Sequence, residues 1–90
     1  MRFELTRRAG NDLKRVFEFN RSRSDEWAIK VQNRLLARAQ ALTTGPRVGR
    51  PFLEAGVFRL SVTDIQYVID YRRGPDFIRI LRFRHTREIR

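Results

Sequence analysis

The spacing of hydrophobic residues changes near Gly45 and separates two kinds of pattern along the chain. Before it, apolar side chains recur at helical spacing over 7–19 and again over 24–43, which predicts two helices that each bury one face. These faces consist of Ala9, Leu13, Val16 and Phe17, and then of Ala28, Val31, Leu35, Ala39 and Leu42. Thr6 fits the N-cap of the first helix, and either Ser22 or Ser24 fits that of the second. A short polar loop joins them, so we expect an antiparallel helical hairpin.

After Gly45 the pattern alternates between apolar and polar residues, as it does in strands. The alternation predicts a three-stranded meander over 57–83, with strands at Val57–Val62, Gln66–Tyr71 and Phe77–Phe83. Turn residues separate the strands at Thr63-Asp64 and at Arg73-Gly74-Pro75-Asp76. Residues 1–5 are predicted to form a short strand at the sheet edge, 44–56 a loop, and 84–90 a basic tail that leaves the sheet.

The predicted order of elements is β-α-α-β-β-β, which indicates an α+β fold. The two helices cannot bury their apolar faces on each other alone. We therefore expect the N-terminal strand and the two-helix hairpin to be combined with a twisted antiparallel sheet, with the hairpin packed on one face. A chain of 90 residues has the length of one domain, so residues 1–90 are expected to form a single unit.

Composition excludes several kinds of chemistry. The chain has no cysteine and one histidine, which excludes disulfides, thiolate zinc sites and a His-based metal cluster. We expect neither a metal nor a cofactor. No apolar stretch approaches the roughly 18–20 residues of a membrane span, and no signal peptide begins the chain. The sequence therefore predicts a soluble, cytoplasmic protein that does not enter a membrane.

Net charge changes this picture most. Lys and Arg together number 20 against 10 Asp and Glu, which gives +10 at neutral pH. Such an excess predicts a polyanionic partner: nucleic acid, a machine that carries nucleic acid, or a strongly acidic protein. Nearly all the basic residues are arginines, which bind phosphate and carboxylate bidentately. Codon bias would explain arginine over lysine, but it would not explain the net charge.

A basic group on the predicted strands and tail is the first candidate site: Arg59, Arg79, Arg82, Arg84, His85 and Arg87. If Arg79 and His85 lie in one extended register, their side chains point to the same side. Such a face could bind RNA and assist attack by a 2′-hydroxyl, with the histidine as acid or base and the arginines stabilising the phosphorane. The alternative is a solvated basic face with a histidine in a structural hydrogen bond.

The second helix offers another candidate surface, for protein contact: Lys30, Arg34 and Arg38 form a column at helical spacing beside Trp27. The alternative is a solvated helix flank with the indole at the edge of the core. The segment Gly45–Pro51 contains glycines and arginines but does not match a phosphate-binding loop, so it is interpreted as a connector.

Several segments together resemble the RelE/ParE superfamily of bacterial toxins. Leu5–Ala9 followed by Asn11-Asp12-Leu13 resembles the opening of the family. The remaining similar segments are Pro46–Arg50, the Arg59-containing strand Val57–Val62, the Tyr-x-x-x-Tyr-Arg strand Tyr67–Arg72, and the closing stretch Ile78–His85 with Arg87. The resemblance covers nearly the whole chain. It implies two helices on an antiparallel sheet, and a toxin that a smaller acidic antitoxin neutralises.

The superfamily that the chain resembles has two branches, which differ in their target. Toxins of the RelE branch cleave mRNA on the ribosome and often carry Arg where this chain has Val68, and no tyrosine follows Phe83 for a C-terminal role. The strands and the Gly-Arg-Pro connector are more similar to the ParE branch, which inhibits DNA gyrase without catalytic residues. That branch implies a protein-contact role for the arginines. In the RelE-like alternative the catalytic residues would be Arg59, His85 and Arg87.

Overall fold

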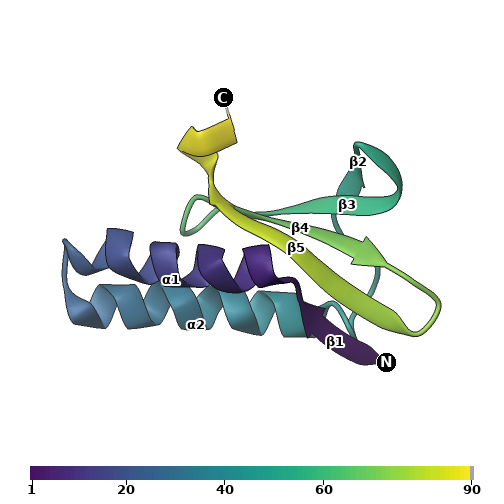
Figure 1. The fold of residues 1–90 in the computed structure, drawn as a ribbon, viewed down its shortest axis with the longest axis horizontal. Helices are drawn as coiled ribbons and strands as arrows, with labels where there is room; N and C mark the ends of the chain where they lie inside the picture. Colours follow the sequence, from purple (N-terminus) through teal and green to yellow (C-terminus); the bar gives the residue numbers. More distant parts are fainter. Residues whose placement is uncertain (90) are drawn as a thin grey trace.

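In a computed structural model, which describes residues 1–89, two helices cover one face of a five-stranded sheet (Figure 1). The elements in chain order are β1 (Arg2–Leu5), α1 (Arg7–Arg21), α2 (Asp25–Ala41), β2 (Arg50–Phe52), β3 (Glu54–Val62), β4 (Tyr67–Arg73), β5 (Phe77–His85) and the 3₁₀ helix η1 (Thr86–Ile89). The strand order across the sheet is β1-β5-β4-β3-β2. The predicted α+β class is confirmed, and the predicted elements follow one another in the expected order, with β2 as a further strand.

The helical hairpin begins where the sequence predicts it. Thr6 is the N-cap of α1, and its hydroxyl accepts a hydrogen bond from the Ala9 N–H at 3.0 Å. Of the two serines considered for α2, Ser24 is the N-cap and accepts from the Trp27 N–H at 3.0 Å. Ser22 instead closes α1, which extends to Arg21. The two helices therefore meet at a loop of only a few residues.

The expectation of a wholly antiparallel sheet is wrong at one edge. The meander β3-β4-β5 is antiparallel, but β1 pairs with β5 in parallel, from Arg2 opposite Phe77 to Leu5 opposite Ile80. A hairpin loop forces its two strands to run antiparallel. No such loop joins β1 to β5, because the rest of the fold lies between them in the chain. The sheet is therefore mixed.

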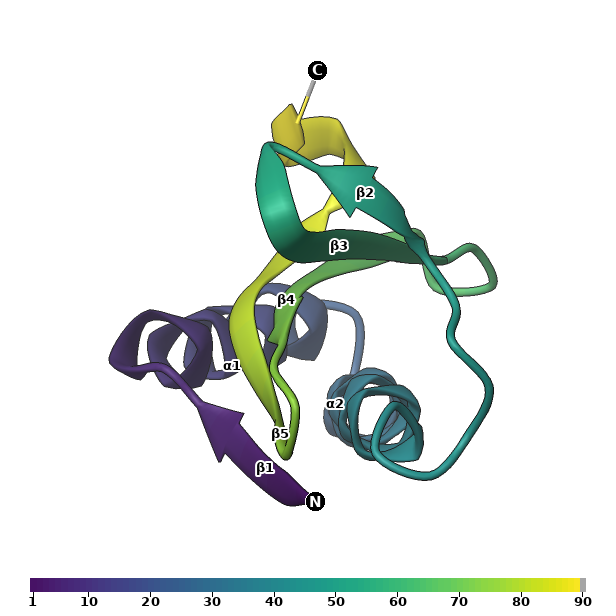
Figure 2. The same cartoon turned by 90° about the vertical axis from the view of Figure 1, so that its right-hand side faces the viewer.

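The segment 44–56, expected to be a loop, contains a further strand. β2 pairs antiparallel with β3, with Arg50 opposite Arg59 and Pro51 opposite Phe58 (Figure 2). β3 accordingly begins at Glu54 rather than at Val57. Three residues are too few to display an alternating pattern, so the sequence gives no sign of β2.

A β-bulge in β5 changes which side chains face the helices. The register shifts between Asp70 and Tyr71, so that Tyr71 lies opposite Ile80 while Asp70 lies opposite Arg82. Leu81 is the extra residue. The buried core accordingly contains Ile78, Ile80 and Phe83, which are not evenly spaced. The bulge reverses the alternation of every residue that follows it.

The predicted tail also differs from the structure in its first residues. β5 continues through His85 instead of ending at Phe83, and η1 follows it directly. The Thr86 N–H donates to the Gln66 carbonyl at 2.9 Å, which holds η1 against the β3–β4 turn. Most of the predicted tail, 84–89, is thus part of the fold, and residue 90 lies outside the described residues.

Candidate functional site

An apolar groove lies between α1 and the end of β5. Its apolar lining comes from Val16 and Phe19 on α1, Tyr67 on β4, and Phe83 and His85 on β5, and its volume is about 450 Å³. Charged side chains from α1 and from the C-terminal segment complete the lining: Asp12, Arg15, Glu18, Arg87 and Glu88. We call this hollow the α1–β5 groove.

Phe19 is the most prominent apolar side chain at the groove. It is 64% exposed, and its ring lies 6.0 Å from that of His85. Phe19, His85 and Arg87 also line a second hollow of about 410 Å³, which extends past Asn20 and Trp27 towards the β3–β4 turn. Phe19 therefore borders both hollows and leaves much of its ring available for contact.

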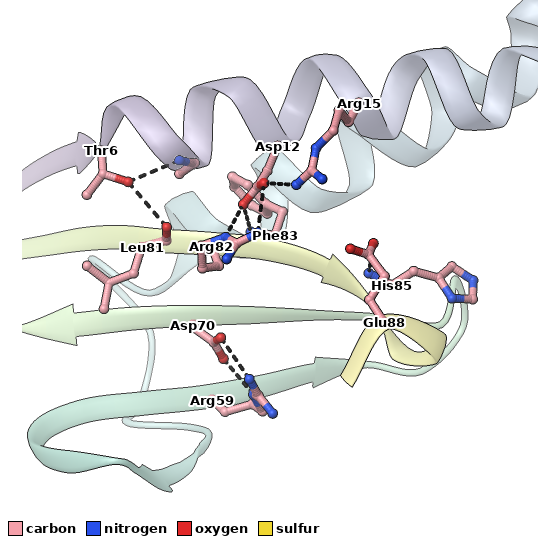
Figure 3. Close-up of polar contacts among 11 residues, drawn as sticks. Thr6, Asp12, Arg15, Arg59, Asp70, Leu81, Arg82, Phe83, His85 and Glu88 are labelled. Carbon is pink, nitrogen blue, oxygen red and sulfur yellow. Dashed lines mark hydrogen bonds and ion pairs between the residues drawn. The ribbon is translucent and has the colours of Figure 1, made fainter. Parts of the chain in front are cut away.

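Asp12 is buried beside the groove and joins α1 to β5 (Figure 3). Its carboxylate accepts from Arg82 Nε at 2.7 Å and from the Phe83 backbone N–H at 3.1 Å, and Arg15 is a further donor. Burial raises the pKa of this carboxyl, but the hydrogen bonds from Arg82, Phe83 and Arg15 outweigh burial and hold the pKa below its ordinary value. Asp12 is therefore ionised at neutral pH and fixes one wall of the groove.

Thr6 makes a second link along the same edge of β5. Besides capping α1, its hydroxyl donates to the Leu81 carbonyl at 3.2 Å (Figure 3). β1 ends at Leu5, so the backbone of β5 beyond Ile80 has no neighbouring strand on that side. Thr6 and Asp12 supply the missing hydrogen-bond partners of the Leu81 carbonyl and the Phe83 N–H. Buried backbone groups need such partners.

Asn20 connects both helices to the sheet at the other end of the groove. Its side-chain nitrogen donates to the Val16 carbonyl at 2.7 Å and to the Tyr67 hydroxyl at 3.0 Å, and its oxygen accepts from Trp27 Nε1 at 3.0 Å. Burial raises the pKa of the Tyr67 phenol, and the Asn20 hydrogen bond opposes that rise only in part. Trp27 is half-buried in this network, and Arg23 lies over its ring at 4.2 Å.

Arg59 is buried in the structure and does not face solvent as a phosphate-binding side chain would. Its Nε and Nη2 donate to the two oxygens of Asp70 at 2.6 and 2.9 Å (Figure 3). Its guanidinium also lies 3.7 Å from the centre of the Phe52 ring. The hydrogen bonds to Asp70 raise the pKa of Arg59 further above its ordinary value, although burial opposes this.

His85 is held by the C-terminal segment. Its backbone N–H donates to Glu88 Oε1 at 3.1 Å, and its Nδ1 accepts from the Arg87 backbone N–H at 3.1 Å. The neutral ring therefore carries its proton on Nε2. The ring also contacts Tyr67 edge to face at 5.0 Å. These contacts agree with the alternative interpretation of His85, in which the histidine makes a structural hydrogen bond.

Of the three residues of the RelE-like alternative, the structure brings His85 and Arg87 together at one groove but places Arg59 elsewhere. Tyr67, against which His85 packs, belongs to the core on the helix side of the sheet. Side chains alternate between the two faces along β4, so Asp70, three residues after Tyr67, points to the other face of the sheet. Its cross-strand partner Arg59 points to that face as well. The condition that Arg79 and His85 share one register is also not met, because the Leu81 bulge lies between them.

The remaining candidate residues are distributed over the surface. Arg79 pairs with Glu4 at 3.0 Å, and Arg34 with Asp64 at 2.9 Å, which ties the basic column of α2 to the β3–β4 turn. Lys30 is exposed and Arg38 is partly buried on the same helix. Within residues 1–89, neither Arg84 nor Arg87 forms an ion pair; Arg84 Nε is buried without a hydrogen-bond partner, and Arg87 lines the groove.

The polar residues that organise the site, Asp12 and Asn20, are not among the site residues predicted from the sequence. Asn20 falls at helical spacing on the apolar face of α1, after Ala9, Leu13 and Val16, and Asp12 lies beside that face. A polar residue in such a position is a signal, because burial requires that its hydrogen bonds be satisfied within the fold. The partner of Arg59 could not be found in this way, because charged residues on the outer face of a sheet are ordinary.

Together, fold and site define a small basic α+β protein with an apolar groove and with several of its strand arginines tied into ion pairs. The chain belongs to the family described as ParE toxin of type II toxin-antitoxin system, parDE, whose model matches residues 3–90. Its fold is similar to that of a solved structure titled "Chromosomal ParDE TA system from P. aeruginosa". The TM-score is 0.85 at 24% identity, over 94% of this chain and 95% of that chain. No curated protein matches the chain.

Two further observations concern residues 1–89. The structure contains no group of three or more His, Cys, Asp or Glu side chains that could hold a metal ion. None of the helices described is long and apolar enough to cross a membrane.

Proposed function

We propose that this chain is the toxin of a toxin–antitoxin pair, that it acts in the cytoplasm by binding DNA gyrase and stalling replication, and that an acidic antitoxin neutralises it. Membership of the ParE toxin family over residues 3–90 is the observation that carries the proposal. The action is inhibition by protein contact and needs no catalytic residue of this chain.

The separation of Arg59 from His85 supports inhibition over RNA cleavage, because it leaves Arg87 alone of the proposed catalytic arginines beside the histidine. In-line cleavage needs a proton-transferring group and a cation at the same phosphate. Here both oxygens of Asp70 occupy the Arg59 guanidinium, and His85 lies on the other side of the sheet. A phosphate bound at one of these residues would not reach the other.

The α1–β5 groove supports neutralisation by an acidic partner. Its lining is apolar around Phe19 and Phe83, and the charged residues that border it are of both signs: Arg15 and Arg87 with Asp12, Glu18 and Glu88. The chain as a whole carries +10. An acidic segment with a few apolar side chains would bury those side chains in the groove, and the net positive charge of the chain as a whole would attract its carboxylates.

A DNA supercoiling assay tests the proposal. The purified chain is added to gyrase with and without the antitoxin encoded beside its gene. We expect inhibition with accumulation of cleaved DNA, and reversal by the antitoxin. His85→Ala is included because a RelE-like nuclease would lose toxicity with this change, whereas a gyrase inhibitor retains it if the variant stays folded.

The opposite result is equally clear. If gyrase is unaffected and the chain cleaves mRNA in a translating extract in a manner that depends on His85 or Arg87, the target is the ribosome and the proposal is wrong.

A further inference from the structure

The first turn of α1 has a charge that opposes the helix. Arg7 and Arg8 are its first two residues, and the turn contains no acidic side chain. The N-terminal end of a helix carries a partial positive charge, so carboxylates stabilise this end and arginines destabilise it. α2 follows the ordinary rule, with Asp25 and Glu26 in its first turn. Helix stability therefore gives no reason for two arginines at the start of α1.

These arginines belong to a continuous basic face of α1. The other sides of the helix pack against α2 and β5 (Figure 2). The face consists of five exposed residues that fall within one arc of the helix: Arg7, Arg8, Asn11, Lys14 and Arg15. We call them the α1 basic face. The next exposed residue of this arc is the acidic Glu18, whose carboxylate lies 3.9 Å from Arg21.

The cations of the α1 basic face are largely free. Within residues 1–89, Arg7, Arg8 and Lys14 form no ion pair. Arg15 pairs with Asp12, but its side chain remains 63% exposed. Several strand arginines, by contrast, are already held by carboxylates of the chain itself. The α1 basic face therefore presents positive charge that the fold does not use.

The α1 basic face has no apolar side chain, and this limits what it can bind. A disordered acidic segment must bury apolar surface to offset its ordering, and a folded protein partner buries an apolar centre in the interface. Small ligands bind in hollows, and four of the five residues line neither hollow described above: Arg7, Arg8, Asn11 and Lys14. A nucleic-acid backbone needs neither feature, because cation–phosphate contacts supply its affinity.

We propose that the α1 basic face binds the phosphate backbone of duplex DNA, and that the toxin thereby holds the DNA on which gyrase acts. The choice of duplex DNA rests on the proposed function, in which gyrase is the target. The face spans about 12 Å of helix, and each strand of duplex DNA carries a phosphate about every 3.4 Å along the axis. Its four cations can thus contact about three phosphates, without reading the base sequence.

A triple variant, Arg7→Gln with Arg8→Gln and Lys14→Gln, tests direct binding. Fluorescence anisotropy with a labelled DNA duplex measures the Kd at several salt concentrations. At about 0.1 M salt we expect binding about tenfold weaker or more, and a slope of log affinity against log salt that is smaller by about 2–3, because each phosphate contact contributes about 0.9. The variant should melt at or above the wild-type temperature, because the opposing charge at the helix start is removed.

A second triple variant is the matched control: Lys30→Gln with Arg47→Gln and Arg50→Gln. It removes the same residue types and the same charge at exposed positions outside α1 that form no ion pair within residues 1–89. Its Kd for the duplex should stay within about twofold of the wild type, because charges act over only about 10 Å at this salt. Equal losses in both triple variants would mean that net charge alone attracts DNA, and would overturn the inference.

Inhibition of gyrase and binding of the antitoxin complete the test. The α1 triple variant should need about tenfold more protein than the control variant for half-maximal inhibition, as for loss of several phosphate contacts. Its antitoxin affinity should match that of the control variant. The inference is overturned if the folded α1 variant inhibits as strongly as the control. It is also overturned if the α1 variant loses more antitoxin affinity than the control, or if the wild type prefers duplex RNA of the same length.

Failure of the proposed function can be told apart from failure of this inference. If the wild type does not inhibit gyrase but binds the DNA duplex through the α1 basic face, the proposed target is wrong and the DNA-binding surface stands. If the wild type inhibits gyrase but does not bind the duplex, the proposed function stands and the inference is overturned.

Discussion

Single polar side chains complete the hydrogen bonding of β5 where its neighbour β1 stops. Thr6 donates to the Leu81 carbonyl, Asp12 accepts from the Phe83 N–H, and Glu88 accepts from the His85 N–H. Each partner comes from a segment next to β5 in space, the first two from the start of α1 and the last from η1. These residues consequently hold α1 and η1 in place against β5 and so position the walls of the groove, without themselves having to contact a partner protein.

Asp12→Asn tests the contribution of the buried carboxylate. The change preserves size but removes the charge that pairs with Arg82, whose side chain is only 16% exposed. We expect a loss of about 3 kcal/mol in the free energy of unfolding, since breaking a buried pair leaves one charge uncompensated. Urea denaturation measures it. Glu18→Gln, at an exposed position of α1, should cost almost nothing; similar losses for both variants would contradict the assignment.

The same carboxylate predicts a pH dependence. Its pKa is lower in the folded chain than the ordinary value of 3.8, so on acidification the unfolded chain takes up the proton first. The stabilisation by Asp12 is therefore complete above the unfolded pKa and is lost as the pH falls through the folded pKa. The difference in unfolding free energy between wild type and Asp12→Asn should shrink below about pH 4. A difference that is constant from pH 7 to pH 3 would refute this.

The Arg59–Asp70 pair predicts strong non-additivity. Both side chains are nearly inaccessible, at 9% and 4%. Arg59→Met or Asp70→Leu alone should each cost about 3–5 kcal/mol, because each leaves a buried charge without its partner. The double variant should lose much less than the sum of the two. Chemical denaturation of all four proteins closes the cycle, and simple additivity would show that the two side chains do not depend on each other.

Among the secondary-structure elements, the long ones could be predicted from the sequence and the short or irregular ones could not. Periodicity over more than ten residues predicts α1 and α2, with Thr6 as the cap of the first and Ser22 or Ser24 as that of the second, of which the structure selects Ser24. β2 has three residues and no pattern. The Leu81 bulge is invisible because both faces of β5 carry apolar residues, so alternation does not reveal a slip by one residue.

That slip decides the interpretation of the candidate site. Alternation without the bulge predicts Arg79 and His85 on one side, which is the basis of the nuclease hypothesis. The bulge places His85 against Tyr67 on the helix side. The groove could not be predicted at all, since it requires the pairing of α1 with the end of β5 across some seventy residues of chain, as in the Asp12–Arg82 contact.

The two N-caps predict a difference between the helices. Thr6 accepts from the Ala9 N–H and also donates to Leu81, whereas Ser24 only caps α2. Thr6→Ala should therefore cost about 2 kcal/mol and Ser24→Ala about 1 kcal/mol. Thr6→Ser keeps the hydroxyl and should retain most of the stability. Thermal unfolding compares the three variants, and equal losses in the two alanine variants would argue against the second role of Thr6.

At the level of the molecule, charge and apolar surface have different positions and different consequences. Several strand arginines are neutralised locally, as Arg59 is by Asp70 and Arg79 by Glu4. The chain nevertheless retains +10 overall. A field of this size acts at long range and accelerates the approach of an acidic partner, while the apolar groove acts only on contact. Charge should therefore govern how fast partners bind, and apolar contact how long they stay bound.

This division predicts opposite responses of the two rate constants for antitoxin binding. Raising the ionic strength from about 0.03 M to about 0.3 M shortens the distance over which charges act, so the association rate constant should fall about tenfold or more. The dissociation rate constant should change little, because the buried apolar contacts are not screened.

Phe19→Ala should have the reverse effect: association nearly unchanged and dissociation faster, because Phe19 is 64% exposed and stands at the groove. Stopped-flow fluorescence separates the two constants. An association rate insensitive to salt would mean that the net charge serves another partner, and a Phe19→Ala variant that dissociates like the wild type would remove the groove from the antitoxin interface.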